Sequence, residues 1–123
     1  MEWKNKNFLD ALKNSMNGIK YAFKSGRNLK IQLVFALIAI VASIVFNLSF
    51  LEWTVVLILI FLVLFAEMMN TVIETVVNMI TTEYNENAKI AKDVAAGAVT
   101  LCAICSVILG LIIFIPKLAE LIK

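Results

Sequence analysis

The first part of the chain alternates apolar and polar positions with helical spacing. Within residues 7–27 the apolar side chains recur every three or four positions, at Phe8, Leu12, Met16, Ile19 and Phe23. Lysines and asparagines occupy much of the remaining surface. This pattern is typical of an amphipathic helix that lies in a membrane interface with its apolar face towards the lipid chains. We therefore predict a surface helix over residues 7–27, followed by a turn at Gly26 and Asn28.

Three longer stretches are apolar almost throughout, over residues 31–48, 53–80 and 94–115. The first and the last approach or exceed the roughly 20 residues that a helix needs to cross hydrocarbon. The middle stretch is longer than the bilayer core requires, because a helix rises about 1.5 Å per residue and the core is about 30 Å thick. Its later turns are therefore expected to reach the headgroups. We expect Pro116 to end the last helix.

The composition agrees with a membrane environment. Hydrophobic residues make up 62% of the 123 residues, and the mean hydropathy is +0.93. A soluble core of this size could not bury so much apolar surface. In hydrocarbon only helices and closed barrels satisfy their backbone groups, and the alternating pattern of barrel strands is missing. We predict an all-α integral membrane protein: one membrane domain over residues 1–123, with three transmembrane helices plus the N-terminal amphipathic surface helix.

Basic residues are distributed unevenly along the chain. Seven of the eleven lie within the first 30 positions, at Lys4, Lys6, Lys13, Lys20, Lys24, Arg27 and Lys30. The polar stretch 81–93 adds Lys89 and Lys92, whereas the connection 48–53 has no basic residue. Since basic residues flank spans on the cytoplasmic side, we expect the N-terminus and the 81–93 loop in the cytoplasm and the C-terminus outside. The same cluster suits an anionic bilayer surface, so we expect no nucleic-acid partner.

Five polar residues fall on one face of the middle stretch. Taking Glu67 as origin and about 100° per residue, the others lie within about 60° of it, at Asn70, Thr71, Glu74 and Asn78. An ionised carboxylate facing lipid is costly, so this face must meet protein, water or a metal. A purely structural explanation is that these side chains form hydrogen bonds between helices. Two carboxylates with an amide also form the oxygen ligand set that Mg²⁺ accepts, or a general-base site.

A second group of charges, Lys92 and Asp93, precedes the last apolar stretch. Taken alone, this pair would be a solvated charge pair at the end of a span. Because it is expected at the same membrane depth as the glutamates of the polar face, Lys92 becomes a candidate phosphate contact. Small residues from Ala91 to Ala98 allow another helix to approach closely. The two cysteines, Cys102 and Cys105, have no further cysteine or histidine to complete a metal site, and we interpret them as small core residues.

Long motifs in the second half of the chain resemble those of the bacterial diacylglycerol kinase family, and in particular its undecaprenol kinase branch. They are E-M-M-N-T-V-I-E-T-V-V over 67–77, Glu83-Tyr84, and A-K-D-V-A-A-G-A-V over 91–99. Gly18, Ala22, Phe23, Arg27-Asn28 and Leu-Glu-Trp at 51–53 are similar to that branch as well. The resemblance covers nearly the whole chain.

The resemblance implies a homotrimer in the bacterial cell membrane, with composite active sites at the cytoplasmic face. It also implies transfer of the γ-phosphate of MgATP to a lipid alcohol, undecaprenol or diacylglycerol. Glu67 would be the general base and Glu74 the magnesium ligand. The expected cofactor-binding set is Asn70, Glu74, Asn78, Glu83, Lys92 and Asp93. Within this set Asn70 would support the phosphate and metal region, Lys92 would contact the ATP phosphates, and Asp93 the nucleoside.

Three positions depart from the family pattern. Gly26 stands where a second metal-binding glutamate is usual, Asn78 where an aspartate is usual, and Asn85 where a histidine is usual. A catalytically weakened or non-catalytic homologue that acts as a membrane assembly protein therefore stays open, as does a phosphohydrolase that uses the same pocket. Small multidrug transporters are also short and carry an intramembrane glutamate. They usually have four spans, however, and the basic amphipathic N-terminal helix of this chain fits them poorly.

Overall fold

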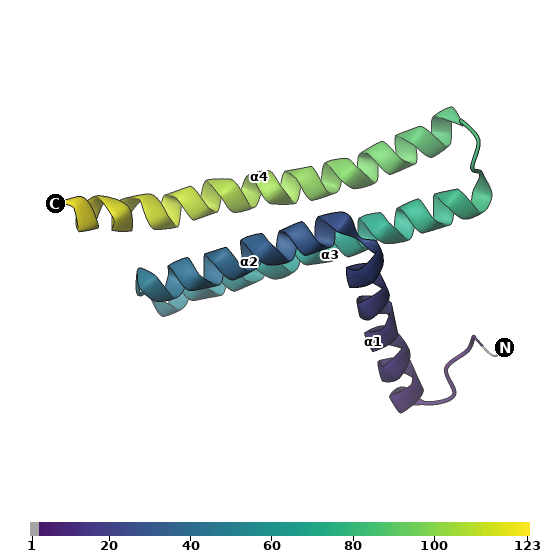
Figure 1. Cartoon of the computed structure of the whole chain (residues 1–123), viewed down its shortest axis with the longest axis horizontal. Helices are drawn as coiled ribbons and strands as arrows, with labels where there is room; N and C mark the ends of the chain where they lie inside the picture. Colours follow the sequence, from purple (N-terminus) through teal and green to yellow (C-terminus); the bar gives the residue numbers. More distant parts are fainter. Residues whose placement is uncertain (1–2) are drawn as a thin grey trace.

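The computed structural model describes residues 3–123, apart from the side chain of Arg27. This part of the chain forms four helices and no strand: α1 (Phe8–Ser25), α2 (Arg27–Val45), α3 (Phe50–Ile80) and α4 (Glu86–Ile122). The helices α2, α3 and α4 run alongside one another, and α1 projects sideways from them (Figure 1). Each of the three long helices is long and apolar enough to cross a membrane. The predicted all-α fold with three such helices is confirmed.

Three of the helices begin at side-chain caps that the sequence encodes. Asn7 accepts a hydrogen bond from the backbone N–H of Asp10 at the start of α1. Ser49 and Glu52 form a reciprocal capping box at the start of α3. Asn85 accepts from a backbone N–H at the start of α4. Each cap satisfies a donor that the first turn of a helix would otherwise leave unpaired.

The breaks between helices also have local causes. Gly26 closes α1 and opens α2 in an extended conformation, so this single residue makes the corner from the surface helix into the first long helix. Asn28, expected in the turn, already belongs to α2. After α2, Asn47 adopts a φ of 52°, in the left-handed region that asparagine tolerates better than most residues. The backbone N–H of Leu48 then reaches back to the carbonyl of Ser43 at 3.1 Å, which closes the helix end.

The last helix is longer at both ends than the stretch 94–115 expected from the sequence. It starts at Glu86, because Asn85 caps it there, so Lys89, Lys92 and Asp93 are helical and only residues 81–85 form a connection. The expectation that Pro116 ends the helix is wrong, since α4 continues to Ile122. Proline removes one backbone hydrogen bond, and a salt bridge of 3.1 Å between Lys117 and Glu52 holds the turns beyond it against α3.

The helix α3 is the centre of the fold, because it packs against α2 on one side and α4 on another. Its buried apolar residues include Val56, Leu59, Val63 and Ala66. Where α1 meets α2, Ala22 and Leu29 are almost fully buried. Most other large apolar side chains are exposed, as expected for surfaces that face lipid. With α1 projecting from three membrane-crossing helices, the fold suits a surface helix lying along the bilayer (Figure 1).

Candidate active site

The polar face of α3 passes from a buried region to an open one along the helix. Glu67 and Asn70 are only 4% and 5% exposed, whereas Glu74 and Asn78, one and two turns further on, are exposed. These residues share a face because their spacing of three, four and four positions matches the helical period. The helix thus presents one enclosed carboxylate and one accessible carboxylate about 10 Å apart along its axis.

The enclosed part of this face is held by neighbouring amides. The side chains of Asn28, from α2, and Asn70 lie beside the Glu67 carboxylate. Asn70 Nδ2 also donates a hydrogen bond of 3.3 Å to Glu74 Oε1, so it links the two glutamates. Its carbonyl oxygen Oδ1 is buried without a hydrogen-bond partner among the described residues. A buried acceptor without a partner is costly unless something completes it.

A polar cavity of about 300 Å³ opens in front of the two glutamates. Its walls come from α1, the Gly26 corner, α2 and α3, with these lining residues: Tyr21, Ser25, Gly26, Asn28, Glu67, Thr71, Glu74, Thr75 and Asn78. The α1 side contributes only neutral groups, a phenol and a hydroxyl. The two glutamates therefore carry all the charge in the lining of this cavity.

Gly26 lies where the corner between α1 and α2 is most crowded. A Cβ built on this residue would lie 2.8 Å from the backbone carbonyl oxygen of Ala22 and 3.4 Å from Leu29 Cβ. A carbonyl oxygen held in helix α1 cannot move aside as a flexible side chain could. The corner as it stands is therefore fitted to glycine, and a glutamate here would require the backbone to shift.

A second cavity, of about 280 Å³, lies between the end of α3, the connection 81–85 and the start of α4. Lining residues with polar side chains include Asn78, Glu83, Lys89, Lys92 and Asp93. Lys92 Nζ donates a hydrogen bond of 2.8 Å to Asn78 Oδ1. Since Asn78 lines both cavities, it joins the carboxylate site to a site with cationic groups.

The fold brings together most of the residues that the sequence singled out. Glu67, Glu74 and Asn78 line the first cavity, and Glu83, Lys92 and Asp93 line the second together with Asn78. Asn70 does not line the first cavity and lies buried behind it. Lys92 and Asp93 are adjacent in sequence but have different partners. Lys92 bonds to Asn78, whereas Asp93 forms a salt bridge of 2.6 Å with Lys89, one turn earlier in α4.

Sequence reasoning missed three residues that line the first cavity: Tyr21, Ser25 and Thr75. Thr71, which the sequence placed on the polar face, lines the cavity as well. Tyr21 and Ser25 come from α1, and only the docking of that helix against α3 places them there. The available signal was their spacing of four positions, which puts both side chains on the same side of a helix, among the lysines of its polar face. Thr75 donates to the carbonyl of Thr71 at 2.8 Å, an ordinary helical bond with no separate sequence signal.

Comparison with known proteins places this arrangement in a family. A sequence model described as prokaryotic diacylglycerol kinase matches residues 13–114. The chain is 36% identical over 111 residues to the undecaprenol kinase of Bacillus subtilis, which covers 90% of each chain. It is 37% identical over 116 residues to a diacylglycerol kinase of Synechocystis, covering 94% of this chain and 66% of that one. A diacylglycerol kinase of Helicobacter pylori is 33% identical over 93 residues, covering 76% and 73%. The chain belongs to the prokaryotic diacylglycerol kinase family, which confirms the resemblance found in its motifs and makes it a membrane enzyme of the lipid kinase type.

Proposed function

We propose that this protein transfers the γ-phosphate of ATP to the hydroxyl of a membrane lipid, undecaprenol or diacylglycerol, at the cytoplasmic face of a bacterial membrane. The observation that carries the proposal is the pair of joined cavities: the enclosed carboxylate of Glu67 lies on one face of α3, and Lys92 of α4 reaches Asn78 on the same face. The family and the names of its relatives support the same reaction class.

Glu67 is the residue best placed to act as general base. Its carboxylate lines the first cavity at the end nearer the middle of α3, which is long and apolar enough to cross the membrane. A lipid hydroxyl would enter the cavity at this end. In the proposed step the carboxylate accepts the hydroxyl proton, the hydroxyl oxygen forms a bond to the γ-phosphorus, and the bond from that phosphorus to the bridging oxygen of ADP breaks. Asn28 and Asn70 keep the carboxylate oriented for this task.

The residues of the first cavity fit a magnesium ion that is completed by substrate. Glu74 offers an accessible carboxylate in the cavity, and behind it lies Asn70, whose buried Oδ1 has no hydrogen-bond partner among the described residues. Within the described residues no group of three or more acidic, histidine or cysteine side chains could hold a metal by itself. Mg²⁺ accepts one or two carboxylates when phosphate oxygens and waters supply the rest. Glu74 would hold the ion, which would neutralise charge on the phosphates.

The second cavity is the proposed place of the nucleotide. Lys92 can exchange its hydrogen bond with Asn78 for a charge-assisted one to a phosphate oxygen. Glu83 and Asp93 lie in the same cavity and would contact the nucleoside. Because Asn78 is about 16 Å from Glu67 along the helix axis, ATP would lie lengthwise along α3, with its γ-phosphate towards Glu67.

The orientation and the assembly belong to the same proposal. The basic residues of the N-terminal 30 positions and the two lysines at the start of α4 lie at the end of the bundle that carries both cavities. This distribution favours the cytoplasm for that end, by the positive-inside bias. A homotrimer, as the resemblance implies, would let α4 of one protomer complete the site of another.

Two alternatives have specific motives. Gly26 supplies no carboxylate to the first cavity, which motivates a weakened or non-catalytic assembly protein. The open cavity beside Glu67 would also admit water in place of a lipid hydroxyl, which motivates a phosphohydrolase.

The deciding experiment is a panel of lipid acceptors with ATP labelled at its γ-phosphate, using the purified full chain in bilayers. We expect label in undecaprenol or diacylglycerol, dependent on Mg²⁺, and little release of inorganic phosphate. Release of phosphate without an acceptor would support the phosphohydrolase. Absence of both products would contradict the kinase and support the assembly protein.

A further inference from the structure

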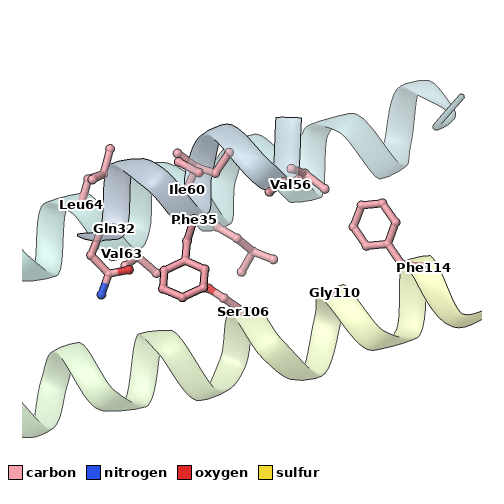
Figure 2. A pocket seen from close by; sticks show the side chains of 12 residues that line it. Gln32, Phe35, Val56, Ile60, Val63, Leu64, Ser106, Gly110 and Phe114 are labelled. Atoms are coloured by element: carbon pink, nitrogen blue, oxygen red, sulfur yellow. The ribbon is translucent and has the colours of Figure 1, made fainter. Parts of the chain in front are cut away.

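An apolar groove runs along the central helix α3, between α2 and α4. Its floor is α3, from Val56 to Leu64, and its walls are α2 and α4. Figure 2 shows Phe35 from α2 and Ser106, Gly110 and Phe114 from α4 facing one another across this floor. The groove exists because α2 and α4 each pack on α3 without packing on each other, as no Cα of one lies within 8 Å of a Cα of the other.

The two ends of the groove differ in polarity. At one end lies Gln32, whose amide makes no hydrogen bond with any side chain or backbone group that the structure describes. Gln32 is one helical turn beyond Asn28, and Val63 in the floor is one turn before Glu67, so this end adjoins the candidate active site. At the other end the ring of Phe114 meets that of Phe46 edge to face, with centroids 5.9 Å apart.

The size of the groove suits one hydrocarbon chain. Its volume is about 140 Å³, and an apolar cavity of about 150 Å³ in a protein holds one benzene, so there is room for roughly six carbons. The floor from Val56 to Leu64 is about 12 Å long, so this small volume leaves the groove only about one chain wide. A helix of about 10 Å diameter could not enter it. The groove therefore has room for a hydrocarbon chain and not for a whole helix of a second copy.

We propose that this groove binds one hydrocarbon chain of the lipid substrate, with the hydroxyl end at Gln32 pointing to Glu67. The bilayer supplies such chains directly, because all three walls belong to membrane-crossing helices. The Gln32 amide would be stabilised by a hydrogen bond from a polar group of the ligand, and the hydroxyl of a lipid alcohol provides such a group. The remainder of a longer chain leaves sideways between α2 and α4. This inference rests on the proposed function for the identity of the lipid as substrate.

Direct labelling tests the groove without requiring turnover. The full chain in bilayers is irradiated with a diazirine-bearing farnesol, and the labelled residues are located by mass spectrometry. We expect label on groove residues of α2 and α4, at most one per chain, and a loss of that label when undecaprenol is added. Label spread evenly over lipid-facing residues, or groove label that undecaprenol does not displace, would overturn the proposal even if the protein is an active kinase.

A filled groove gives the second test. A Cβ at Gly110 meets no atom within 4 Å, so Gly110→Leu adds its side chain to open space in the groove and leaves the backbone undisturbed. Cys105→Leu is the matched control, because it enlarges an exposed side chain of the same helix outside the groove lining. We expect Gly110→Leu to cut groove labelling at least tenfold and to raise the KM for undecaprenol similarly with kcat little changed. Cys105→Leu should match wild type.

Two results would contradict this account. Equal labelling of the two leucine variants would show that the groove is not the chain site. A changed oligomeric state of Gly110→Leu, with labelling intact, would show that the groove packs another protomer instead. If wild type labels as expected but phosphorylates no lipid, the groove stands and the proposed reaction fails.

Discussion

Replacing Lys92 by methionine separates a catalytic role from a structural one. The substitution keeps an unbranched side chain that is one atom shorter, and it removes the charge. Within the part of the chain that the structure describes, the Nζ group makes a single solvent-exposed hydrogen bond, to Asn78 at 2.8 Å. Losing an exposed bond of this kind lowers the free energy of unfolding by about 1 kcal/mol or less. The variant should therefore fold and melt nearly as wild type does.

The effect on phosphoryl transfer should be far larger. A charged donor aimed at a transition-state oxygen contributes about 2.7–4 kcal/mol, which corresponds to a 100- to 1,000-fold change in rate. We expect Lys92→Met to lower kcat/KM for ATP by that factor, measured as label transferred from ATP to undecaprenol in bilayers. Lys24→Met is the control, since Lys24 is exposed in the last turn of α1 and lines neither cavity; it should change the rate by about twofold or less.

The reasoning would be refuted by a Lys92→Met enzyme that turns over within twofold of wild type. It would be refuted equally if both variants lost activity to the same extent, because the effect would then reflect the net charge of the protein surface and not a contact in the second cavity.

Three further predictions concern stability in detergent. Asn85→Ala removes the cap of α4 and should lower the free energy of unfolding by about 1 kcal/mol in thermal melts; an unchanged melt would show that the cap does not hold this helix end. Gly26→Ala brings a Cβ within 2.8 Å of a backbone carbonyl and should cost about 1–3 kcal/mol, whereas Gly18→Ala, in open space within α1, should stabilise; the reverse order would refute the crowded corner. Lys117→Met breaks the bridge to Glu52 and should lower the Tm without changing kcat; an unchanged Tm would mean that the turns beyond Pro116 need no such contact.

The sequence predicted the parts of this protein that depend on one helix at a time. The face shared by Glu67, Glu74 and Asn78 follows from spacing alone, because a helix of any length repeats every 3.6 residues. The three long apolar stretches follow from the bilayer in the same way. Both features are confirmed as helices in the structure. The chemical roles of the polar residues remain predictions.

The sequence could not predict what depends on packing between helices. Tyr21 and Ser25 line the first cavity only because the end of α1 next to Gly26 contacts both α2 and α3. The pairing of Asp93 with Lys89 required knowing that α4 begins at Glu86, in a stretch polar enough to suggest a loop. The groove at Gly110 combines residues from three helices, none of which is unusual in its own segment.

The continuation of α4 through Pro116 also depends on a contact between helices. A proline inside a soluble helix usually ends or kinks it, which was the basis of the expectation. Here the salt bridge between Lys117 and Glu52 joins residues that are far apart in sequence, and the apolar surroundings favour a hydrogen-bonded backbone. The apolar stretch before the proline is visible in the sequence, but the pairing of Lys117 with Glu52 is not.

The central claim is that Glu67 takes the proton from a lipid hydroxyl during phosphoryl transfer. Its most direct test is the rate of label transfer from ATP to undecaprenol by Glu67→Gln, beside Glu52→Gln at the opposite end of the same helix. We predict a loss of about 100- to 10,000-fold for Glu67→Gln, with elution from size-exclusion chromatography unchanged, and near wild-type turnover for Glu52→Gln. A Glu67→Gln enzyme as fast as wild type would contradict the mechanism.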